Sequence, residues 1–145
     1  MQFDPGNHIV KLCAHGMMLE GEGKRSDAEQ LFQQAWTGAT TATEKFVAAH
    51  YLARHQTSIA DKLKWDETAL DHALLIGGTE VESIFPSLYL NIGKCHEDMN
   101  DLHKAYKNYQ TAFTYLHALP DDGYGNMIRS GIINGLNRVA PNESI

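Results

Sequence analysis

Hydrophobic positions in this 145-residue chain recur at steps of three and four residues, the period of helices that bury one face. No stretch shows the strict alternation of a half-buried strand. Glycine, proline and capping residues divide the pattern into seven predicted helices. They run from Pro5 to the glycines at 21–23, from Ser26 to Gly38, from Thr41 to Gln56, from Ile59 to Ile76, from 83–86 to Asn100, from Asp101 to the turn at 119–123, and over about 125–139.

Individual side chains predict several helix ends. Asp4 followed by Pro5 predicts the start of the first helix, because an aspartate cap often precedes a proline in the first turn. Capping boxes are predicted at Ser26–Glu29 and Thr41–Glu44. Asn100 is predicted to end a helix in the left-handed conformation.

Four residues recur later in the chain with their spacing intact. They are Gly16, Ala28, Phe32 and Ala35, repeated as Gly93, Ala105, Tyr109 and Ala112, each displaced by the same number of positions. Ala73 falls near the midpoint of Ala35 and Ala112, so the spacing predicts three helical hairpins of about 38 residues. Small residues let the two helices of a hairpin cross closely. A non-repetitive helical bundle is the alternative, since small residues occur at helix contacts there too.

With these spacings the sequence resembles the tetratricopeptide repeat family. The first unit carries Leu12, His15, Gly16, Leu19, Ala28, Phe32 and Ala35, and the third carries Tyr89, Ile92, Gly93, His96, Ala105, Tyr109 and Ala112. The middle unit departs: with Leu52 and Ala53 in the first helix, Leu70 and Ala73 are one residue out of register. The resemblance implies a single all-α domain over 1–145, a right-handed α-α superhelix of about seven helices. Its repeats would span about 5–39, 41–78 and 83–119, with a capping helix at about 124–139.

The predicted capping helix has an apolar stripe that would cover the third repeat. The stripe consists of Ile128, Ile132, Leu136 and Val139. Gly131 and Gly135 predict close approach to a neighbouring helix, or else a weak, frayed helix.

Proteins of this family typically hold a peptide or partner protein in a concave groove lined by the first helix of each repeat. The resemblance implies groove positions at Val10, Cys13, Met17, Glu20, Val47, His50, Arg54, Thr57, Ser87, Leu90, Lys94 and Glu97. His50, Arg54 and Lys94 would form a small positive patch able to hold a carboxylate, or simply a solvated helix face. The clamp that some members use for a partner's C-terminal carboxylate is not expected, since Val10, Cys13 and Met17 replace its polar residues.

Composition narrows the choice of partner and compartment. Hydrophobic residues make up 43% of the chain and charged residues 21%, typical of a globular protein. The net charge of −6 and the scattered cations argue against nucleic acid, which requires a clustered basic surface. No apolar run approaches the roughly 20 residues that span a bilayer, and no signal peptide pattern is seen, so we expect a cytoplasmic protein without membrane contact. Cys13 and Cys95 are expected to be reduced and buried.

Motifs for catalysis are missing from the sequence. No histidine pair has the four-residue helical spacing of a zinc site, and GEGK at 21–24 lacks the spacing of a phosphate loop. We therefore predict no enzyme activity, no cofactor and no metal. The function predicted is a non-catalytic adaptor that binds an unidentified protein or peptide. The alternatives are a homo-oligomeric structural module, such as a homodimer, and an enzyme with an atypical His/Cys site.

Overall fold

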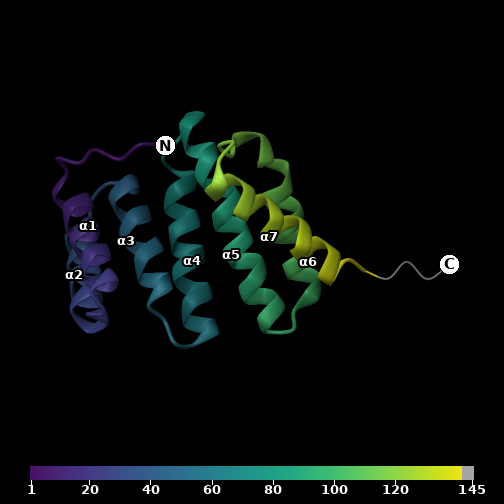
Figure 1. Cartoon of the computed structure of the whole chain (residues 1–145), viewed down its shortest axis with the longest axis horizontal. Coiled ribbons are helices and arrows are strands. Elements are labelled where there is room, and N and C mark those ends of the chain that lie inside the picture. Colours follow the sequence, from purple (N-terminus) through teal and green to yellow (C-terminus); the bar gives the residue numbers. More distant parts are fainter. Residues whose placement is uncertain (142–145) are drawn as a thin grey trace. The chain divides into compact units, whose positions relative to one another are not determined.

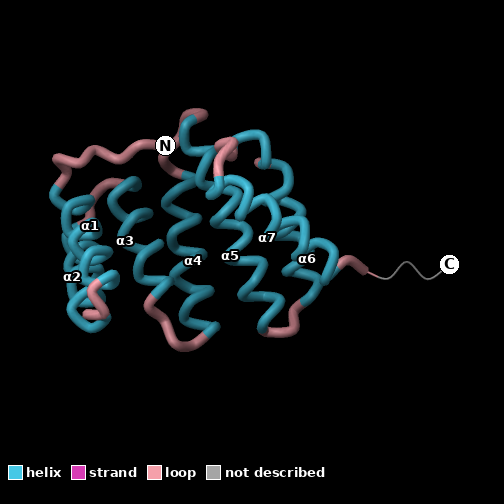
Figure 2. The backbone as a smooth tube through the Cα atoms, in the orientation of Figure 1, coloured by secondary structure: helices cyan, strands magenta, loops and turns pink. Residues whose placement is uncertain are grey.

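The computed structural model describes residues 1–141, which form seven α-helices, two short 3₁₀ helices and no strand (Figures 1 and 2). The α-helices are α1 (His8–Gly21), α2 (Arg25–Gly38), α3 (Ala42–Arg54), α4 (Ile59–Leu74), α5 (Phe85–Asp98), α6 (Leu102–Thr114) and α7 (Gly123–Val139). The 3₁₀ helices are η1 (Glu80–Ile84) and η2 (Leu116–Ala118). The predicted all-α class is confirmed. Across this described stretch, no helix is both long and apolar enough to cross a bilayer.

Two compact units make up the chain, unit 1 (Met1–Gly77) and unit 2 (Gly78–Ile145). In unit 1 the hairpin α1/α2 precedes the hairpin α3/α4, and α3 packs against both α1 and α2. In unit 2 the hairpin α5/α6 is followed by α7, which packs against both of its helices. Each unit therefore contains a hairpin and a third helix packed against it.

The first helix begins later than Asp4 and Pro5 predict. The Asp4 side chain accepts a hydrogen bond from the Gly6 amide and forms a turn ahead of the helix. Asn7 is the actual cap, and its side-chain oxygen accepts from the amides of Ile9 and Val10. The predicted start was wrong because the aspartate satisfies a local turn instead of the first helical turn.

The predicted capping box at Ser26–Glu29 is also wrong. Helix α2 begins at Arg25, and its N-cap Lys24 makes no side-chain capping bond. Gly23 has φ +79°, and the Lys24 amide then donates back to the Leu19 carbonyl at 2.8 Å. This tight turn starts the helix early, so Ser26 already lies inside its first turn.

Other predicted helix ends are confirmed. Thr41 and Glu44 form the complete capping box at the start of α3. Asn100 has φ 62° after α5, and Asp101 caps α6. Gly77 follows α4 at φ +75°, a conformation that glycine adopts without steric cost.

Each unit buries the repeated small and aromatic residues at its hairpin crossing. Ala28, Phe32 and Ala35 of unit 1 and their counterparts Ala105, Tyr109 and Ala112 of unit 2 are all fully buried. A Cβ atom added to Gly93 would lie 2.7 Å from the Tyr109 ring, and one added to Gly16 would likewise overlap the Phe32 ring. The close crossings predicted from the repeated spacing are confirmed in each unit.

The hairpin α3/α4 uses a different set of small residues. Ala53, Ala69 and Ala73 are buried there, while Leu70 is only half-buried. Asp66 is also buried, with its Oδ2 2.6 Å from the Lys62 Nζ atom. This ion pair inside the hairpin was not expected from the sequence.

Helix α7 covers the hairpin α5/α6 with its predicted stripe. Ile128, Ile132 and Val139 are buried, and Leu136 packs against the same core. A Cβ atom on Gly131 would lie 3.1 Å from Leu90, and one on Gly135 would lie 2.8 Å from Tyr109. The two glycines therefore permit close approach, and a frayed helix is not what the sequence forms.

Candidate functional site

Helices α1 and α3 lie side by side in parallel and are tied together at their N-terminal ends. The Asn7 side chain, which caps α1, also donates to Oε2 of Glu44 in the α3 capping box at 2.8 Å. This hydrogen bond, followed by those from Thr40 and Thr41, lowers the pKa of Glu44 to about 2. The tie sets the register of the two helices, so residues at their C-terminal ends also meet.

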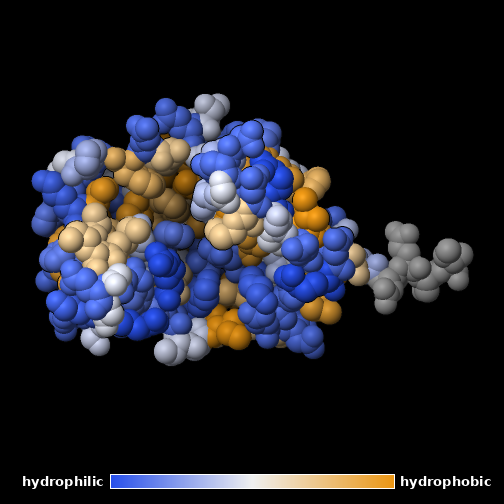
Figure 3. Space-filling model, viewed as in Figure 1, coloured by the Kyte–Doolittle hydropathy of each residue, from blue (hydrophilic) through white to orange (hydrophobic). Residues whose placement is uncertain are grey.

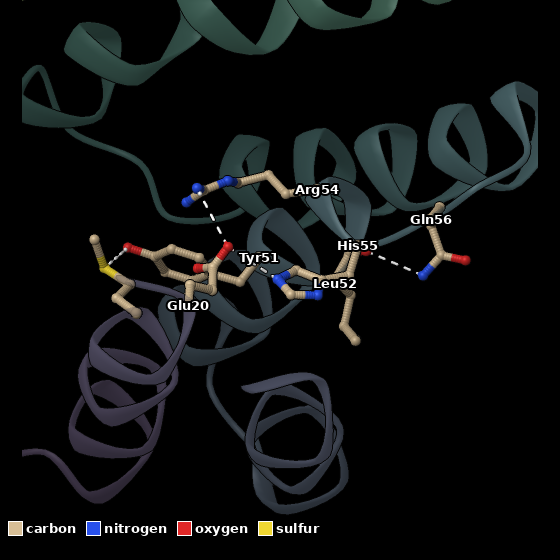
Figure 4. Close-up of polar contacts among 7 residues, drawn as sticks. Glu20, Tyr51, Leu52, Arg54, His55 and Gln56 are labelled. Carbon is tan, nitrogen blue, oxygen red and sulfur yellow. Dashed lines mark hydrogen bonds and ion pairs between the residues drawn. The ribbon is translucent and has the colours of Figure 1, made fainter. Parts of the chain in front are cut away.

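Glu20 of α1 meets two basic side chains at this C-terminal end (Figure 4). His55 Nε2 lies 3.0 Å from Oε2 of Glu20, and the Arg54 guanidinium lies 3.5 Å from the same oxygen. The His55 side chain is buried, whereas 47% of the Arg54 side chain is exposed. Oε1 of Glu20 is buried and has no hydrogen-bond partner within the protein.

Tyr51 provides an aromatic surface beside this carboxylate. Its ring stacks on Phe32 with centroids 5.0 Å apart, and its hydroxyl donates to the Met17 sulfur at 2.7 Å. The Arg54 guanidinium carbon lies 5.6 Å from the centre of the Tyr51 ring, within cation–π distance. Burial raises the pKa of Tyr51, so its hydroxyl stays protonated at neutral pH.

His50 lies one residue before Tyr51 and is uncharged at neutral pH. Burial, followed by the positive charges of Arg54 and Lys62, lowers its pKa to about 4. Its ring packs edge-on against Tyr51, at 5.4 Å between centroids. Its Nδ1 atom is buried without a hydrogen-bond partner in the protein, as is Nδ1 of His55.

Four of the predicted groove residues in unit 1 therefore gather on adjacent helices. They form, with Tyr51 and His55, what we call the Glu20 cluster: Met17, Glu20, His50, Tyr51, Arg54 and His55. Cys13 and Val47 lie in the core instead, and burial raises the pKa of the Cys13 thiol to about 11. Val10 is half-buried, and Thr57 is exposed.

The predicted groove residues of unit 2 are largely engaged in contacts within that unit. Ser87 donates to the Ile84 carbonyl, and Lys94 pairs with Asp98 at 2.8 Å. Leu90 packs under α7, and Glu97 is paired with Arg138 of α7. Lys94 of the predicted positive patch thus lies in unit 2, while His50 and Arg54 lie in unit 1.

Sequence reasoning missed the partners of the two glutamates. Tyr51 and His55 of unit 1 and Arg138 of unit 2 were not among the predicted site residues. A signal was present, because Glu20 and Glu97 are separated by the same offset as Gly16 and Gly93. Equivalent residues of α3 and α7 are separated by a larger number of positions, and this larger offset relates Arg54 to Arg138. A search for residues repeated at the shorter offset therefore does not pair the two arginines.

The Glu20 cluster includes an exposed apolar side chain but no metal-binding group of residues. The face drawn in Figure 3 carries mostly hydrophilic residues, with hydrophobic side chains exposed in small groups. Met17 is 46% exposed and supplies apolar surface at the cluster. Among residues 1–141, no three His, Cys, Asp or Glu side chains come together as a metal site. Cys13 and Cys95 are both free thiols and buried, as predicted.

Comparisons with protein-family models, with curated proteins and with solved structures found no match for this chain. The function is therefore argued from the Glu20 cluster itself.

Proposed function

We propose that this chain is a non-catalytic protein-interaction module whose α1/α3 face in unit 1 holds an extended peptide segment of a partner protein. The resemblance to tetratricopeptide repeats supports this, and we extend it to a right-handed superhelical stacking of successive hairpins. The single observation that carries the proposal is the Glu20 carboxylate, which offers a buried acceptor atom, Oε1, without a partner.

The chemistry of the Glu20 cluster suits a peptide backbone. Oε1 of Glu20 has the capacity for one more hydrogen bond, and a peptide N–H group is a suitable donor once an exposed neighbour such as Met17 moves aside to uncover the atom. Arg54 has most of its five N–H donors free of short contacts and can donate to a carbonyl or carboxylate oxygen. A peptide supplies a donor and an acceptor in alternation, which matches this pair.

Met17 and His50 give the face its apolar component. The Met17 side chain is flexible and exposed, and such side chains adapt to different apolar partners. His50 is uncharged, so its ring offers a flat surface without the desolvation cost of an imidazolium ion. We therefore expect a peptide with an apolar residue next to the one that bonds to Glu20 and Arg54.

Selection from a random peptide library displayed on phage tests the proposal. Peptides selected on the full chain would be labelled and titrated against the wild type, Arg54→Ala and Met17→Ala by fluorescence anisotropy. We expect Arg54→Ala to weaken binding about tenfold or more, since a hydrogen bond to a charged group contributes roughly 1.5–3 kcal/mol. Met17→Ala should weaken it less.

Gln33→Ala is the matched control, because Gln33 is exposed on α2 and lies outside the Glu20 cluster. Its affinity for the peptides should equal that of the wild type. Peptides that bind equally well to the wild type, Arg54→Ala and Met17→Ala would place the binding site elsewhere. A library that yields no peptide with saturable binding would also contradict the proposal.

A further inference from the structure

The third helix of each unit packs on its hairpin in the same way. In unit 1, the Tyr51 ring of α3 stacks on Phe32 of α2. In unit 2, Gly135 of α7 takes the place of Tyr51 and approaches Tyr109 of α6, the counterpart of Phe32. The pair α6/α7 in unit 2 is therefore the counterpart of α2/α3 in unit 1.

The ion pairs confirm this correspondence. Arg54 of α3 meets Glu20 of α1, and Arg138 of α7 meets Glu97 of α5. The two glutamates are as far apart in the sequence as Phe32 and Tyr109. The two arginines are separated by the larger offset, the one between Tyr51 and Gly135. The same two offsets thus relate the ring contacts and the ion pairs, so each residue of α2 and α3 can be compared with its counterpart in α6 and α7.

In unit 1, the outer side of α2/α3 is covered by the fourth helix. The Trp65 ring of α4 meets the Trp36 ring of α2 edge to face at 5.1 Å, and His72 of α4 meets the same ring at 6.0 Å. Helix α4 also packs along α3, where Ala49 is fully buried. The aromatic contacts with Trp36 and the packing along α3 thus hold α4 in place.

The same positions in unit 2 are open among the described residues. Phe113 is the counterpart of Trp36 and is 50% exposed, and Ile133 is the counterpart of Ala49 and is 40% exposed. A hollow of about 390 Å³ adjoins α6 and α7 near Val139. Val139 is the counterpart of His55, the residue after which the chain of unit 1 leaves α3 and continues to α4. Leu102 and Tyr106 line this hollow.

We infer that this α6/α7 face, marked by Phe113 and Ile133, is a docking site for an amphipathic helix of a partner protein that has the pattern of α4. That pattern is an aromatic residue followed by small residues four and eight positions later, as in Trp65, Ala69 and Ala73. The aromatic residue packs against Phe113, and the small residues let the helix backbone approach α7. This surface is separate from the Glu20 cluster, and the inference does not rest on the proposed function.

A partner protein is favoured over a second copy of this chain by the sequence itself. Trp65 is the only aromatic residue of the chain with alanine or glycine both four and eight positions later. Ala69 and Ala73 are already fully buried within unit 1. A second copy therefore offers no free helix of the required pattern.

A helical peptide with the α4 sequence, residues 58–76, provides the probe. A hydrocarbon staple between positions 67 and 71, both exposed in α4, would hold it helical, and a fluorophore would report binding to the full chain. We expect saturable binding that Phe113→Ser or Ile133→Ser weakens at least tenfold. Trp65→Ser in the peptide should weaken binding to a similar degree.

Met18→Ser is the matched control, since Met18 is an exposed apolar residue of α1 in unit 1 and does not belong to the α6/α7 face. It should leave binding unchanged. The inference would be overturned if no saturable binding occurred up to about 1 mM peptide, a value that marks very weak association. It would also be overturned if Phe113→Ser and Ile133→Ser left binding intact, as expected if the peptide displaces α4. Dimerisation of the unliganded chain that Phe113→Ser abolishes would overturn it too, because a second copy would then be the occupant. Circular dichroism of each variant checks that the helices are retained.

Discussion

Glu20 of unit 1 and Glu97 of unit 2 occupy equivalent positions near the ends of α1 and α5, yet their carboxylates are held differently. Arg138 donates to both oxygens of Glu97, at 2.8 and 3.0 Å, and the Tyr109 hydroxyl donates to Oε1 at 2.7 Å. Both contacts to Glu20 reach one oxygen, and the other has no partner within the protein. One carboxylate is fully engaged and its counterpart is half engaged.

The two-pronged contact from Arg138 accounts for part of this difference, and a single hydroxyl group accounts for another part. Tyr109 stands where unit 1 has Phe32, and a phenylalanine ring cannot donate a hydrogen bond. In unit 2 the complete set of donors lowers the pKa of Glu97 to about 2, with the Arg138 hydrogen bonds the largest cause. The comparison teaches that equivalent carboxylates of the two units can be fully hydrogen-bonded in one unit and keep an unused acceptor atom in the other.

The largest effect is expected from a charge placed at the hairpin crossings. Ala28→Glu in unit 1 and Ala105→Glu in unit 2 each bury a carboxylate that has no partner, at a position fully buried in the native protein. Each should lower the free energy of unfolding by about 4 kcal/mol or more. Urea denaturation followed by far-UV circular dichroism measures the loss. Both tryptophans, Trp36 and Trp65, lie in unit 1, so their fluorescence reports specifically on Ala28→Glu.

Gln33→Glu and Gln110→Glu add the same charge at exposed positions of α2 and α6 and serve as matched controls. The free energy of unfolding of each control should lie within about 0.5 kcal/mol of that of the wild type. A wild-type denaturation curve for Ala105→Glu would contradict the close packing on which the comparison of the two units depends.

The sequence predicted the elements and crossings that depend on local chemistry. The glycine and alanine spacing specified both hairpin crossings, because close approach of two helices excludes larger side chains at those points. Asn100 was predicted because asparagine tolerates the left-handed conformation, and the Thr41–Glu44 box because its side chains bond to their own backbone. Glu20, His50 and Arg54, which gather in the candidate site, were among the groove positions that the family resemblance implied.

The remaining features depend on contacts between distant segments. Asp4 and Ser26 have capping side chains, but a turn before α1 and an early start of α2 override them. The stripe of α7 was predicted to cover the third hairpin, but its contact with Leu90 and the burial of Cys13 and Val47 depend on which residues of the packed helices meet. His55 and Arg138 could not be assigned as partners of glutamates 35 and 41 residues away.

A smaller difference between the units is expected on acidification. His50 has a pKa of about 4 in the folded state and roughly 6.5 when unfolded, so the unfolded chain binds more protons between these values. Its contribution to stability is complete above pH 6.5 and is lost as the pH falls toward 4. Glu97 has a pKa of about 2 against roughly 4.3 unfolded, so its contribution is lost only below pH 4.3.

The urea concentration at the unfolding midpoint, measured by tryptophan fluorescence at pH 7 and pH 5, tests whether His50 titrates before Glu97. Unit 1 should lose stability over this interval in the wild type and lose less of it in His50→Gln. Glu97→Gln should change the acid response only below about pH 4.3, the ordinary value for a glutamate. An equal loss between pH 7 and pH 5 in the wild type and His50→Gln would show that His50 is not the responsible group.

The smallest effects are expected when the aromatic residues of the two units are exchanged. Tyr109→Phe removes the hydroxyl that bonds to Glu97, and we expect a loss of about 1.5–3 kcal/mol, the range for a hydrogen bond to a charged group. Tyr124→Phe, at an exposed position of α7, is the control and should be neutral. Calorimetric unfolding at pH 7 measures both. Equal stability of Tyr109→Phe and the wild type would show that Arg138 alone satisfies Glu97.

Phe32→Tyr makes the opposite change, placing a hydroxyl where the counterpart Tyr109 reaches Glu97. Oε1 of Glu20 should accept this new bond, with a gain in stability of about 1 kcal/mol or less, since the hydroxyl also gives up its bonds to water. The same bond should weaken library-selected peptides, because their N–H donor then competes with the tyrosine for one oxygen. A gain in stability with unchanged peptide affinity would mean that Oε1 is not the peptide acceptor, and the contrast between the two glutamates would then concern stability alone.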